Sequence, residues 1–444
     1  MIDVLKILRI ACAARQGKSL TPEEKEQAIE ILAWQSALLQ LVEEHPEPLR
    51  PTVQALSDYL SCHGGDGIAR MYASNMLEEF RQGVIDGLGI DPSFETVEQW
   101  LQCINYVIQR APEYEGQHFP LSKLFVFFMY TPSGAVLFRL ERFNVLMTAV
   151  LQAWCVYLDS PDSKKVLNPS LQTPAQDGWL SPASQTSNCL EQCVNFQYKD
   201  DPEKPYWGFC SYNDFFHRQI DLVQYRPLAG EGDDKVIVSA NDGTVYRLAR
   251  NVKLCDKFWT KGQEYSLIDM LEGSPYIESF IEGDVLQSFL DGSDYHRWHA
   301  PISGTVIEAR VISGLTFSEL RSEGLDLSAG TESQGYQAMV NTRGLIVIEN
   351  STIGKVVVLP IGITEISSVT FTVKVGQQVG KGEELGYFSY GGSSMALVFQ
   401  KGMIQAFVAQ EPDPDREIPA CKYQGTCAAD AGCLMVRSEI AVAN

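Results

Sequence analysis

The stretch VKVGQQVGKGEELGYFSYGGSSMALVF, residues 373–399, decides the fold class of this 444-residue chain. Its glycines interrupt short runs of valine, leucine and aromatic residues, a pattern typical of short strands joined by tight turns. Outward from it, the same pattern recurs in KVIVSA (235–240), TVIEARVI (305–312), LIVIEN (345–350), KVVVLPIGI (355–363) and SSVTFTVKV (367–375). These segments predict a strand-rich region over residues 206–410. A tail that contains proline and cysteine, residues 411–444, completes the domain 206–444.

The front of the chain has helical periodicity instead. Residues 22–44 place apolar side chains at helical spacing after Thr21, a residue suited to cap a helix N-terminus. Segment 96–111 repeats the pattern, and Pro112 should end that helix. Segment 143–158 is the most apolar of all, but it is shorter than the roughly 20 residues that span a bilayer. It therefore predicts a buried core helix.

These patterns together predict an α+β fold. A helical N-terminal domain is expected over residues 1–160. Residues 161–205 are rich in Ser, Pro, Asn, Gln and Asp, which is typical of a connector.

The charge balance excludes two classes of partner. The chain carries 35 Lys and Arg against 56 Asp and Glu, a net charge of −21. A field of this sign repels phosphate backbones and anionic lipid, so we expect no nucleic acid partner and no stable membrane insertion. Arg9 interrupts the only apolar stretch near the N-terminus, which argues against an export signal and favours a cytoplasmic location.

The eleven cysteines invite a metal interpretation. Cys189 and Cys193 are one helical turn apart, and Cys421, Cys427 and Cys433 are spaced by six in a polar tail. Neither set has a histidine nearby, and the CxxC pattern of zinc sites is absent. We therefore expect free thiols in a reducing compartment and no metal.

The stretch 373–388 also has the layout of a lipoyl- or biotinyl-carrier-like hairpin sandwich. A carrier would present a lysine at the tip of the next hairpin. Here that tip reads Gly391-Gly392-Ser393-Ser394, and the nearest lysine, Lys401, lies beyond the following strand. This departure disfavours a swinging-arm carrier and leaves a serine after two glycines.

A serine after glycine suggests self-cleavage, although a lone GGSS is more often a flexible turn. Gly392 has no Cβ, so the Ser393 hydroxyl can approach its carbonyl and convert the peptide into an ester. β-Elimination of that ester, followed by hydrolysis, would leave a pyruvoyl group. The chemistry needs an imidazole base and a carboxylate that orients it, and His299 and Asp242 are candidates.

Several short motifs now fit one known family. They are NDFFHR (213–218), ANDG (240–243), YHRWHAP (295–301), NTR (341–343), VVVLPIGITEISSV (356–369) and a GxxVxKGxxLGxFxxGGSS frame that ends at Ser394. In this order, over roughly residues 206–405, they resemble the self-processing, pyruvoyl-dependent phosphatidylserine decarboxylase family.

The resemblance implies a role for each matching residue. Ser393 would be the pyruvoyl precursor and take the substrate amine as a Schiff base, with Gly392–Ser393 as the cleaved bond. His299 would be the base for self-cleavage and Asp242 would orient it. His296 would be the acid/base of decarboxylation. The chains 1–392 and 393–444 would stay associated, no PLP would be needed, and homo-oligomer formation is left open.

Two departures bear on the substrate. The family commonly shows GST where this chain has Gly392-Ser393-Ser394, and VGATNVG where it has IGITEIS, which introduces Glu365. The chain is most similar to a soluble branch of aromatic L-amino acid and tryptophan decarboxylases. That branch implies a free aromatic amino acid, L-tryptophan first, with Glu365 and Trp298 as substrate-binding candidates. The alternatives are phosphatidylserine, giving phosphatidylethanolamine, or a non-catalytic binding scaffold.

Overall fold

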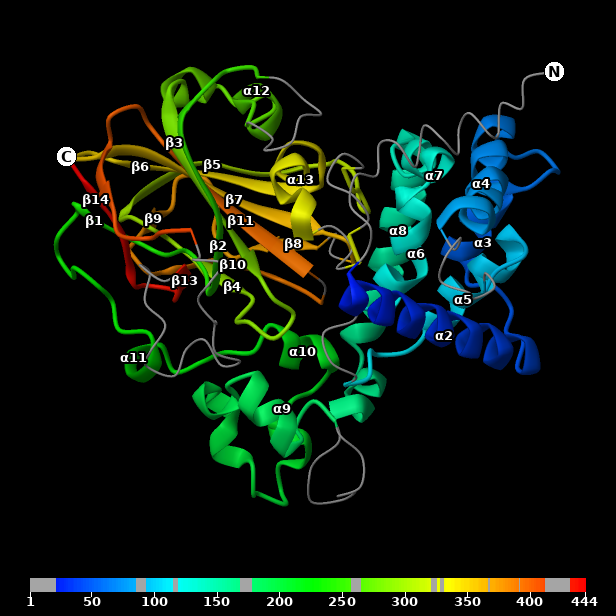
Figure 1. Cartoon of the computed structure of the whole chain (residues 1–444). Helices are drawn as coiled ribbons and strands as arrows, with labels where there is room; N and C mark the ends of the chain where they lie inside the picture. Colours follow the sequence, from blue (N-terminus) through cyan, green and yellow to red (C-terminus); the bar gives the residue numbers. More distant parts are fainter. Residues whose placement is uncertain are drawn as a thin grey trace. The chain divides into compact units, whose positions relative to one another are not determined.

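The computed structural model contains both helices and sheets, as the α+β prediction requires (Figure 1). It describes residues 21–84, 93–114, 119–167, 178–256, 265–320, 326–327, 331–365, 368–390, 392–411 and 432–444. The chain divides into two compact units. The first comprises Met1–Gln109, Pro120–Val150 and Phe317–Ser333, and the second comprises Arg110–Phe119, Leu151–Thr316 and Gln334–Asn444. The domain boundaries at residues 160 and 205 stay a prediction.

The first unit is helical. Its elements are α2 (Pro22–Glu44), α3 (Pro51–Leu60), α4 (Gly67–Glu79), a π-helical turn η1 (Phe80–Val84), α5 (Val97–Val107), α6 (Pro120–Tyr130), α7 (Pro132–Leu137), the start of α8 (Glu141–Leu158) and η8 (Thr331–Ser333). Thr21 caps α2 as predicted, because its Oγ1 accepts from the Glu24 amide at 3.1 Å while the Glu24 carboxylate accepts from the Thr21 amide. Helix α5 ends before Pro112, and Ile108 forms its C-cap.

Helix α8 is buried on one face only. Phe143, Met147 and Val150 are fully buried, whereas Val145 is 53% exposed and Val156 is 72% exposed. The predicted core helix is thus an amphipathic one. Within the described residues, no helix is both long and apolar enough to cross a membrane.

The second unit carries short helices ahead of and between its strands. They are η2 (Pro161–Leu167), α9 (Pro182–Ser187), η3 (Leu190–Gln192), η4 (Val194–Tyr198), η5 (Pro205–Gly208), α10 (Tyr212–Phe216), α11 (Leu222–Tyr225), α12 (Leu267–Met270), η6 (Ile277–Phe280) and α13 (Gln334–Val340). The described part of the predicted connector is therefore mostly short helical turns.

Three antiparallel sheets form the rest of this unit. The strands are β1 (Val236–Val238), β2 (Gly243–Val252), β3 (Gly283–Leu290), β4 (Arg297–His299), β5 (Gly304–Ile312), β6 (Arg343–Asn350), β7 (Gly354–Ile363), β8 (Val369–Phe371), β9 (Gln378–Val379), β10 (Glu384–Phe388), β11 (Gly392–Phe399), β12 (Ile404–Phe407), β13 (Cys433–Leu434) and β14 (Glu439–Ala443). The large sheet has the order β13-β2-β3-β11-β7-β6-β5-β9, and the small sheets are β1-β14-β12 and β4-β10-β8.

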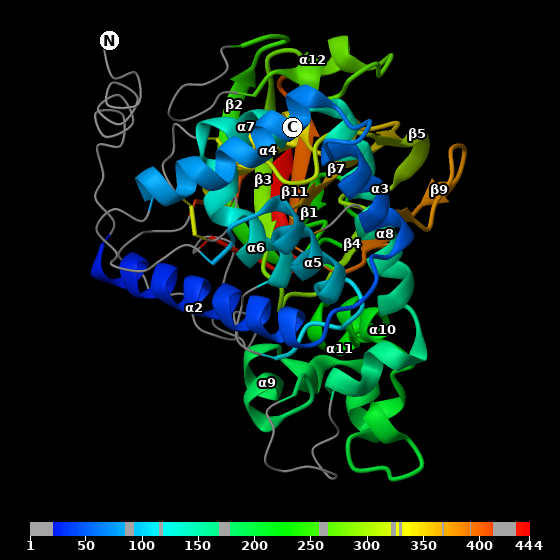
Figure 2. The same cartoon turned by 90° about the vertical axis from the view of Figure 1, so that its right-hand side faces the viewer.

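The central strands of the large sheet, β3, β11, β7 and β6, are buried on both faces, which explains their continuous apolar sequences. Along β7, Val356 and Val358 face one core, which is completed by residues of the two small sheets. Val357 and Leu359 face a second core, with α12 and α13. In Figures 1 and 2, α12 lies at the top of the view, above the long strands. Strand β11, which begins with the predicted cleavage site, is central in this sheet. The carrier-like detail of the preceding hairpins remains a prediction.

The cysteines differ from the expectation. Cys189 and Cys433 are both disulfide-bonded, so the prediction of free thiols is wrong for these two. The free thiols of the described ranges are Cys62, Cys103, Cys155, Cys193, Cys210 and Cys255. Cys421 and Cys427 lie outside the described residues. Where the structure is described, no group of three or more His, Cys, Asp or Glu side chains could hold a metal ion.

Candidate active site

Ser393 begins the central strand of the large sheet. In β11 it pairs with Leu290 of β3 and with Gly362 of β7. Its side chain is fully buried, and its Oγ has no hydrogen-bond partner among the described residues. A buried hydroxyl without a partner costs free energy, roughly 1–3 kcal/mol, so its presence calls for a functional reason.

By contrast, the hydroxyl of the neighbouring Ser394 both donates and accepts a hydrogen bond. Its Oγ donates to the carbonyl oxygen of Ser288 at 2.8 Å and accepts from the Gln287 amide at 2.9 Å. Of the two adjacent serines, only Ser393 therefore has a hydroxyl that is available for attack on the preceding glycine. Gly392 itself pairs with Ile363 of β7.

His299 ends strand β4 and is held in one tautomer. Its Nδ1 lies 2.9 Å from the Gly382 carbonyl oxygen, which can only accept, so Nδ1 carries the proton. Nε2 is then the acceptor of the Tyr295 hydroxyl at 3.0 Å. Burial lowers the pKa of His299. The ring is consequently neutral at pH 7, with a basic nitrogen directed at Tyr295.

Asp242 does not orient His299 by a hydrogen bond. Its carboxylate accepts from Arg226 Nε at 3.0 Å and Nη2 at 2.6 Å, and from the Val436 amide at 2.7 Å. No contact within the described residues joins it to the His299 ring, although its negative charge helps to hold the pKa of His299 up. A backbone bond from the His299 amide to the Ala240 oxygen, at 2.8 Å, connects the two segments.

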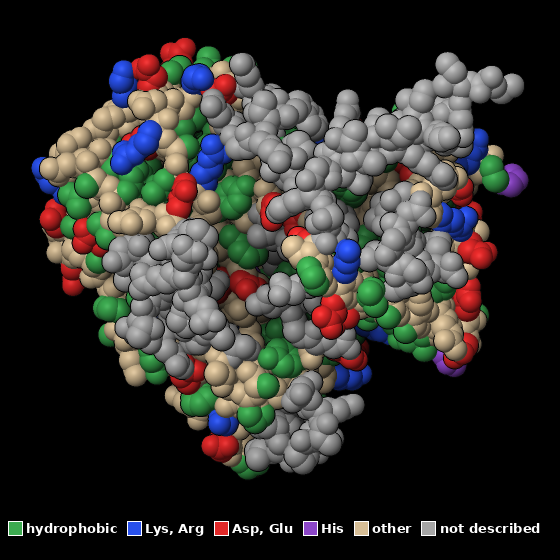
Figure 3. Space-filling model, in the orientation of Figure 1, with side chains coloured by type: hydrophobic (Ala, Val, Ile, Leu, Met, Phe, Trp, Pro, Cys, Tyr) green, Lys and Arg blue, Asp and Glu red, His purple; other side chains and the backbone are tan. Residues whose placement is uncertain are grey.

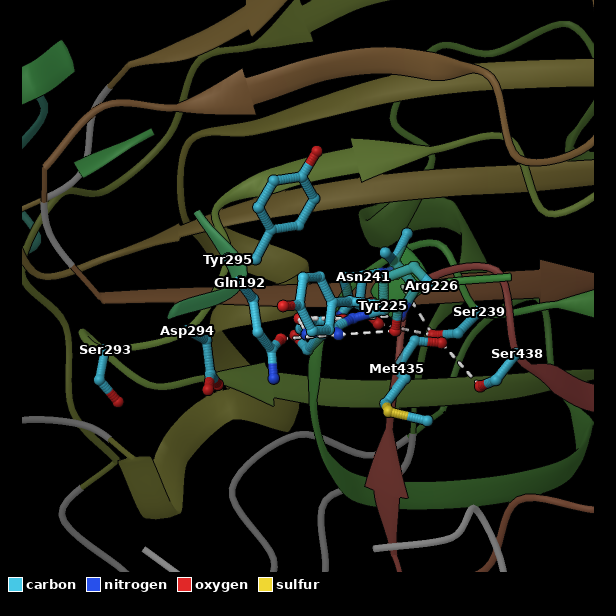
Figure 4. A network of polar contacts seen from close by, with 12 residues as sticks. Gln192, Tyr225, Arg226, Ser239, Asn241, Ser293, Asp294, Tyr295, Met435 and Ser438 are labelled. Atoms are coloured by element: carbon cyan, nitrogen blue, oxygen red, sulfur yellow. Dashed lines mark hydrogen bonds and ion pairs between the residues drawn. The ribbon is translucent and has the colours of Figure 1, made fainter. Parts of the chain in front are cut away.

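The Arg226 network thus takes the place that the sequence assigned to a triad. Figure 4 shows Arg226 among Gln192, Asn241 and Met435. Both partners of the ion pair are almost fully buried, so each depends on the other for solvation. Arg226 was not singled out by the sequence, because it belongs to none of the motifs that pointed to the site.

His296 is fully buried and stacks on Phe216, with 3.9 Å between ring centroids. Its ring nitrogens make no well-formed hydrogen bond with described residues, only a weaker polar contact with the Asp294 backbone. Burial, and secondarily the positive charge of Arg218, lowers its pKa well below the ordinary value. His296 is therefore neutral at pH 7, not poised near neutrality as an unperturbed imidazole would be.

Arg218 is a second site residue that sequence reasoning missed, although it ends the NDFFHR motif. It is buried, and its Nη2 donates to the carbonyl oxygens of Asn188 at 3.2 Å and Ser293 at 2.6 Å. Arg218 thereby fixes the segment that leads into His296.

Aromatic contacts connect His296 to the cleavage site. Phe216, which stacks on His296, also packs on Tyr390 at 5.3 Å. Tyr390 is three residues before Ser393 and packs on Tyr212 at 5.3 Å. The Phe388 amide donates to the His296 carbonyl oxygen at 3.0 Å. The structure thus brings His296 close to the segment that ends at Ser393.

Glu365 lies just beyond the end of β7, the strand that pairs with Gly392. It is buried and accepts a hydrogen bond from Tyr390. Burial first, and the Glu365 charge second, raises the pKa values of Tyr390 and Tyr212, so both stay as phenols. The preceding Thr364 has φ of 56°, a strained conformation for a β-branched residue, and such strain is typical of functional sites.

Trp298 has a structural environment. Its ring is fully buried in the core between the sheets, packed on Phe371 at 5.8 Å and Phe388 at 6.1 Å. These contacts are those of a core side chain, and its role in substrate binding stays a prediction.

Comparisons with known proteins agree with the motifs. A family model for phosphatidylserine decarboxylase matches residues 212–436, and a second model for the same enzyme matches residues 50–188. Decarboxylase iboD of Amanita muscaria is 35% identical over 297 residues, which is 63% of this chain and 83% of that protein. An L-tryptophan decarboxylase of Psilocybe cubensis is 30% identical over 341 residues, 73% of this chain and 78% of that protein.

A bacterial relative extends the comparison. A phosphatidylserine decarboxylase proenzyme of Chlamydia muridarum is 33% identical over 205 residues, 46% of this chain and 64% of that protein. The first family model spans half of the chain and includes Asp242, His296, His299 and Ser393. The chain therefore belongs to the phosphatidylserine decarboxylase family and is a decarboxylase, of a family whose members are pyruvoyl-dependent.

Proposed function

We propose that this protein cleaves itself between Gly392 and Ser393 and then decarboxylates a free aromatic L-amino acid, with L-tryptophan giving tryptamine and CO2. One observation carries the proposal. The Ser393 hydroxyl is buried without a hydrogen-bond partner among the described residues, whereas the hydroxyl of the adjacent Ser394 makes two hydrogen bonds. These residues fit a pyruvoyl group, because residue 393 is enclosed and its hydroxyl is not committed to the fold. PLP is not required.

Self-cleavage is a reaction of the chain's own atoms. Ser393 Oγ attacks the Gly392 carbonyl carbon while its proton leaves to a base, and the peptide nitrogen is released as an amine. β-Elimination then frees the Gly392 carboxylate, and water replaces the nitrogen of the resulting dehydroalanine, with loss of ammonia. His299 is the base we assign, since its Nε2 is unprotonated. The Gly382 carbonyl oxygen positions the His299 ring, and Asp242 influences His299 only through its negative charge.

The chains 1–392 and 393–444 would remain together. Strand β11 lies between β3 and β7, and β14 lies between β1 and β12. Strand β11 is hydrogen-bonded on both sides to strands in residues 1–392. Strand β14 is hydrogen-bonded to β1 of residues 1–392 and to β12 of its own chain. Extraction of the small chain would expose both cores of the unit.

A pyruvoyl group at residue 393 would supply a ketone that withdraws electrons from the carbon that loses CO2. His296 lies close to the segment that ends at residue 393, and the lowering of its pKa makes its protonated form a strong donor, so it would deliver a proton to that carbon after CO2 has left. The surrounding aromatic residues Tyr212, Phe216 and Tyr390 exclude water from this transfer.

Several observations favour a free amino acid. The L-tryptophan decarboxylases of Psilocybe cubensis and Psilocybe cyanescens align over 73% and 70% of this chain, against 46% for the bacterial phosphatidylserine enzyme. The net charge of −21 disfavours an anionic bilayer. On the face in Figure 3, acidic side chains stand among the basic ones, an arrangement that also disfavours nucleic acid.

Phosphatidylserine is the second candidate substrate, because the matching family models and the bacterial relative carry that name. A cytoplasmic location is part of the proposal for a free amino acid. The burial of Cys189 and Cys433, at 7% and 1% exposure, would shield their disulfides from thiol reductants there.

The decisive experiment combines mass and activity. Intact mass of purified protein should show residues 393–444 as a separate chain with a pyruvoyl terminus. A panel of L-tryptophan, L-tyrosine, L-phenylalanine and micellar phosphatidylserine, each with Ser393→Ala as control, should give CO2 from the aromatic amino acids. Activity on phosphatidylserine alone would refute the substrate, and a free serine terminus would refute the cofactor.

A further inference from the structure

One tyrosine hydroxyl of the candidate site has no hydrogen-bond partner among the described residues. Tyr212 begins α10 and is fully buried. Buried hydroxyls are usually paired, because a hydroxyl that leaves water without gaining a partner destabilises the fold. Ser393 Oγ also lacks a described partner, and the proposed self-cleavage accounts for it. Tyr212 has no part in that step, so its hydroxyl needs an explanation of its own.

Tyr212 belongs to the aromatic cluster that connects His296 to the cleavage site. Its ring packs on Tyr390 at 5.3 Å, and it lies within 25° of parallel to Phe216, with 6.5 Å between ring centroids. Tyr390 is three residues before Ser393, and Phe216 stacks on His296. Tyr212 is therefore one ring contact away from each of the two residues that contact the reacting segments.

The other neighbours of the Tyr212 ring are aromatic as well. Trp179 packs on it at 5.6 Å and Phe215 at 6.1 Å. The hydroxyl is thus a polar atom in largely apolar surroundings. Sites for small aromatic ligands commonly combine apolar walls with a few polar groups that fix the orientation of the ligand. These surroundings suit a flat ring that carries one polar atom.

Charge decides which group of a substrate can meet the Tyr212 hydroxyl. Burial, and then the negative charge of Glu365, raises the pKa of Tyr212 well above its ordinary value, so the group stays an uncharged phenol. This influence of Glu365 exceeds the opposite one of Arg218, so a substrate carboxylate would be repelled. The substrate ammonium nitrogen is committed to residue 393 in the proposed reaction. Of the polar groups of L-tryptophan, the indole N–H remains, and a phenol oxygen can accept from it.

We propose that Tyr212 is a specificity residue, whose phenol oxygen accepts a hydrogen bond from the indole N–H and so favours L-tryptophan over ring systems without a donor. The inference rests on the proposed function, since it concerns the substrate of the same site. Bound L-tryptophan would satisfy the hydroxyl that the described fold leaves unpaired. An analogue without the N–H would leave it buried and unpaired, and would be used less well.

The first test compares two substrates that differ in one ring atom. 3-Benzothienyl-L-alanine has the shape of L-tryptophan, but sulfur replaces the N–H. Fully cleaved parent protein should prefer L-tryptophan in kcat/KM by about 10- to 100-fold, the usual effect of leaving a buried polar group unpaired. Tyr212→Phe should lower kcat/KM for L-tryptophan by a similar factor and leave that for the analogue close to the parent value. An unchanged preference in Tyr212→Phe would overturn the proposal.

The second test separates recognition from a structural role. In uncut Ser393→Ala protein, Tyr212→Phe removes a hydroxyl that has no described partner, so the urea midpoint should stay the same or rise. Tyr265→Phe is the matched control, because Tyr265 is also buried but its hydroxyl donates to Gln287 Oε1 at 2.5 Å. That variant should lower the midpoint. An equal fall in Tyr212→Phe would show that the fold itself uses the Tyr212 hydroxyl, and would refute the proposal.

Failure of this inference differs from failure of the proposed function. A parent protein that releases CO2 from L-tryptophan, with the same preference over the analogue as Tyr212→Phe, would refute the role of Tyr212 alone. A parent that stays uncut, or that releases no CO2 from either amino acid, would refute the proposed function and indole recognition with it.

Discussion

The Asp242 carboxylate is paired with Arg226, at 2.6 Å from Oδ2 to Nη2, and not with the imidazole of His299. His299 instead takes its tautomer from the Gly382 carbonyl. The residue expected to orient the base therefore stabilises the fold around it. It joins Arg226 to the Val436 amide of the proposed small chain.

Asp242→Asn should act mainly by lowering the stability of the protein, and not by weakening His299 as a base. Loss of the carboxylate charge leaves Arg226 buried without a counter-charge, a change that typically costs about 3–5 kcal/mol. We expect Arg226→Gln to slow self-cleavage as much as Asp242→Asn does, with similar losses in the urea midpoint. The measurements are urea unfolding and the fraction cleaved over time. If Arg226→Gln matured at the parent rate while Asp242→Asn did not, the result would contradict this interpretation and show that Asp242 acts directly on His299.

Self-cleavage should require Ser393 and His299. Ser393→Ala removes the nucleophile and His299→Ala removes its base, so each variant should remain one uncut chain. His63→Ala is the matched control, because His63 is exposed and far along the sequence from the site. Denaturing electrophoresis under reducing conditions gives the result. If His299→Ala matured at the normal rate, another group would have to be the base, and His296 would be the next candidate.

His296→Ala should separate maturation from turnover. The variant should still be cut and still react with borohydride in the presence of substrate amine, since neither step uses this imidazole. Turnover should fall by about 100- to 10,000-fold, the usual loss for a missing proton-transfer group. Decarboxylation at the parent rate would contradict the assignment.

The strands and helices were predictable because their signals are local. Strand β7 lies within one residue of its predicted start, since both faces of the sheet are buried and its sequence is apolar throughout. Thr21 likewise identified the start of α2. Strand β8 is shorter than the pattern of 367–375 predicted, covering Val369–Phe371.

The polar partners in the site were not predictable in the same way. Ser393 stood out because it is next to Gly392 in a characteristic frame. The pairing of Asp242 with Arg226, and the disulfide state of Cys189 and Cys433, depend on contacts between segments that fold together from distant positions. Residue spacing gives no information on such contacts. A motif identifies a carboxylate in the sequence, but it does not show which side chain the carboxylate pairs with in the fold.

Acid should destabilise the fold through its buried histidines. Burial lowers the pKa values of His217, His296 and His299 in the folded state, whereas unfolded histidines titrate near 6.5. As the pH falls below about 6.5, the unfolded chain binds protons that the folded chain does not, so the free energy of unfolding decreases. Each such proton contributes a slope of up to about 1.4 kcal/mol per pH unit.

The measurement is urea unfolding of uncut Ser393→Ala between pH 7.5 and 5.0, which avoids chain dissociation. His296→Gln in that background should flatten the slope by about one proton, whereas exposed His63→Gln should leave it unchanged. An identical slope with His296→Gln would mean that His296 is protonated in the folded state.

Glu365→Gln should change substrate binding and leave maturation intact. Glu365 is buried, bonded to Tyr390, and next to the strained Thr364 at the end of the strand that pairs with Gly392. The amide keeps the shape but removes the charge. A charge-assisted hydrogen bond contributes about 1.5–3 kcal/mol, so KM for an aromatic amino acid should rise by about 10- to 100-fold, with kcat changed much less. Tyr390→Phe, which removes the hydroxyl that holds Glu365, should shift KM in the same direction by a smaller factor. Steady-state kinetics on fully cleaved protein tests both variants, and an unchanged KM in Glu365→Gln would exclude its carboxylate from substrate binding.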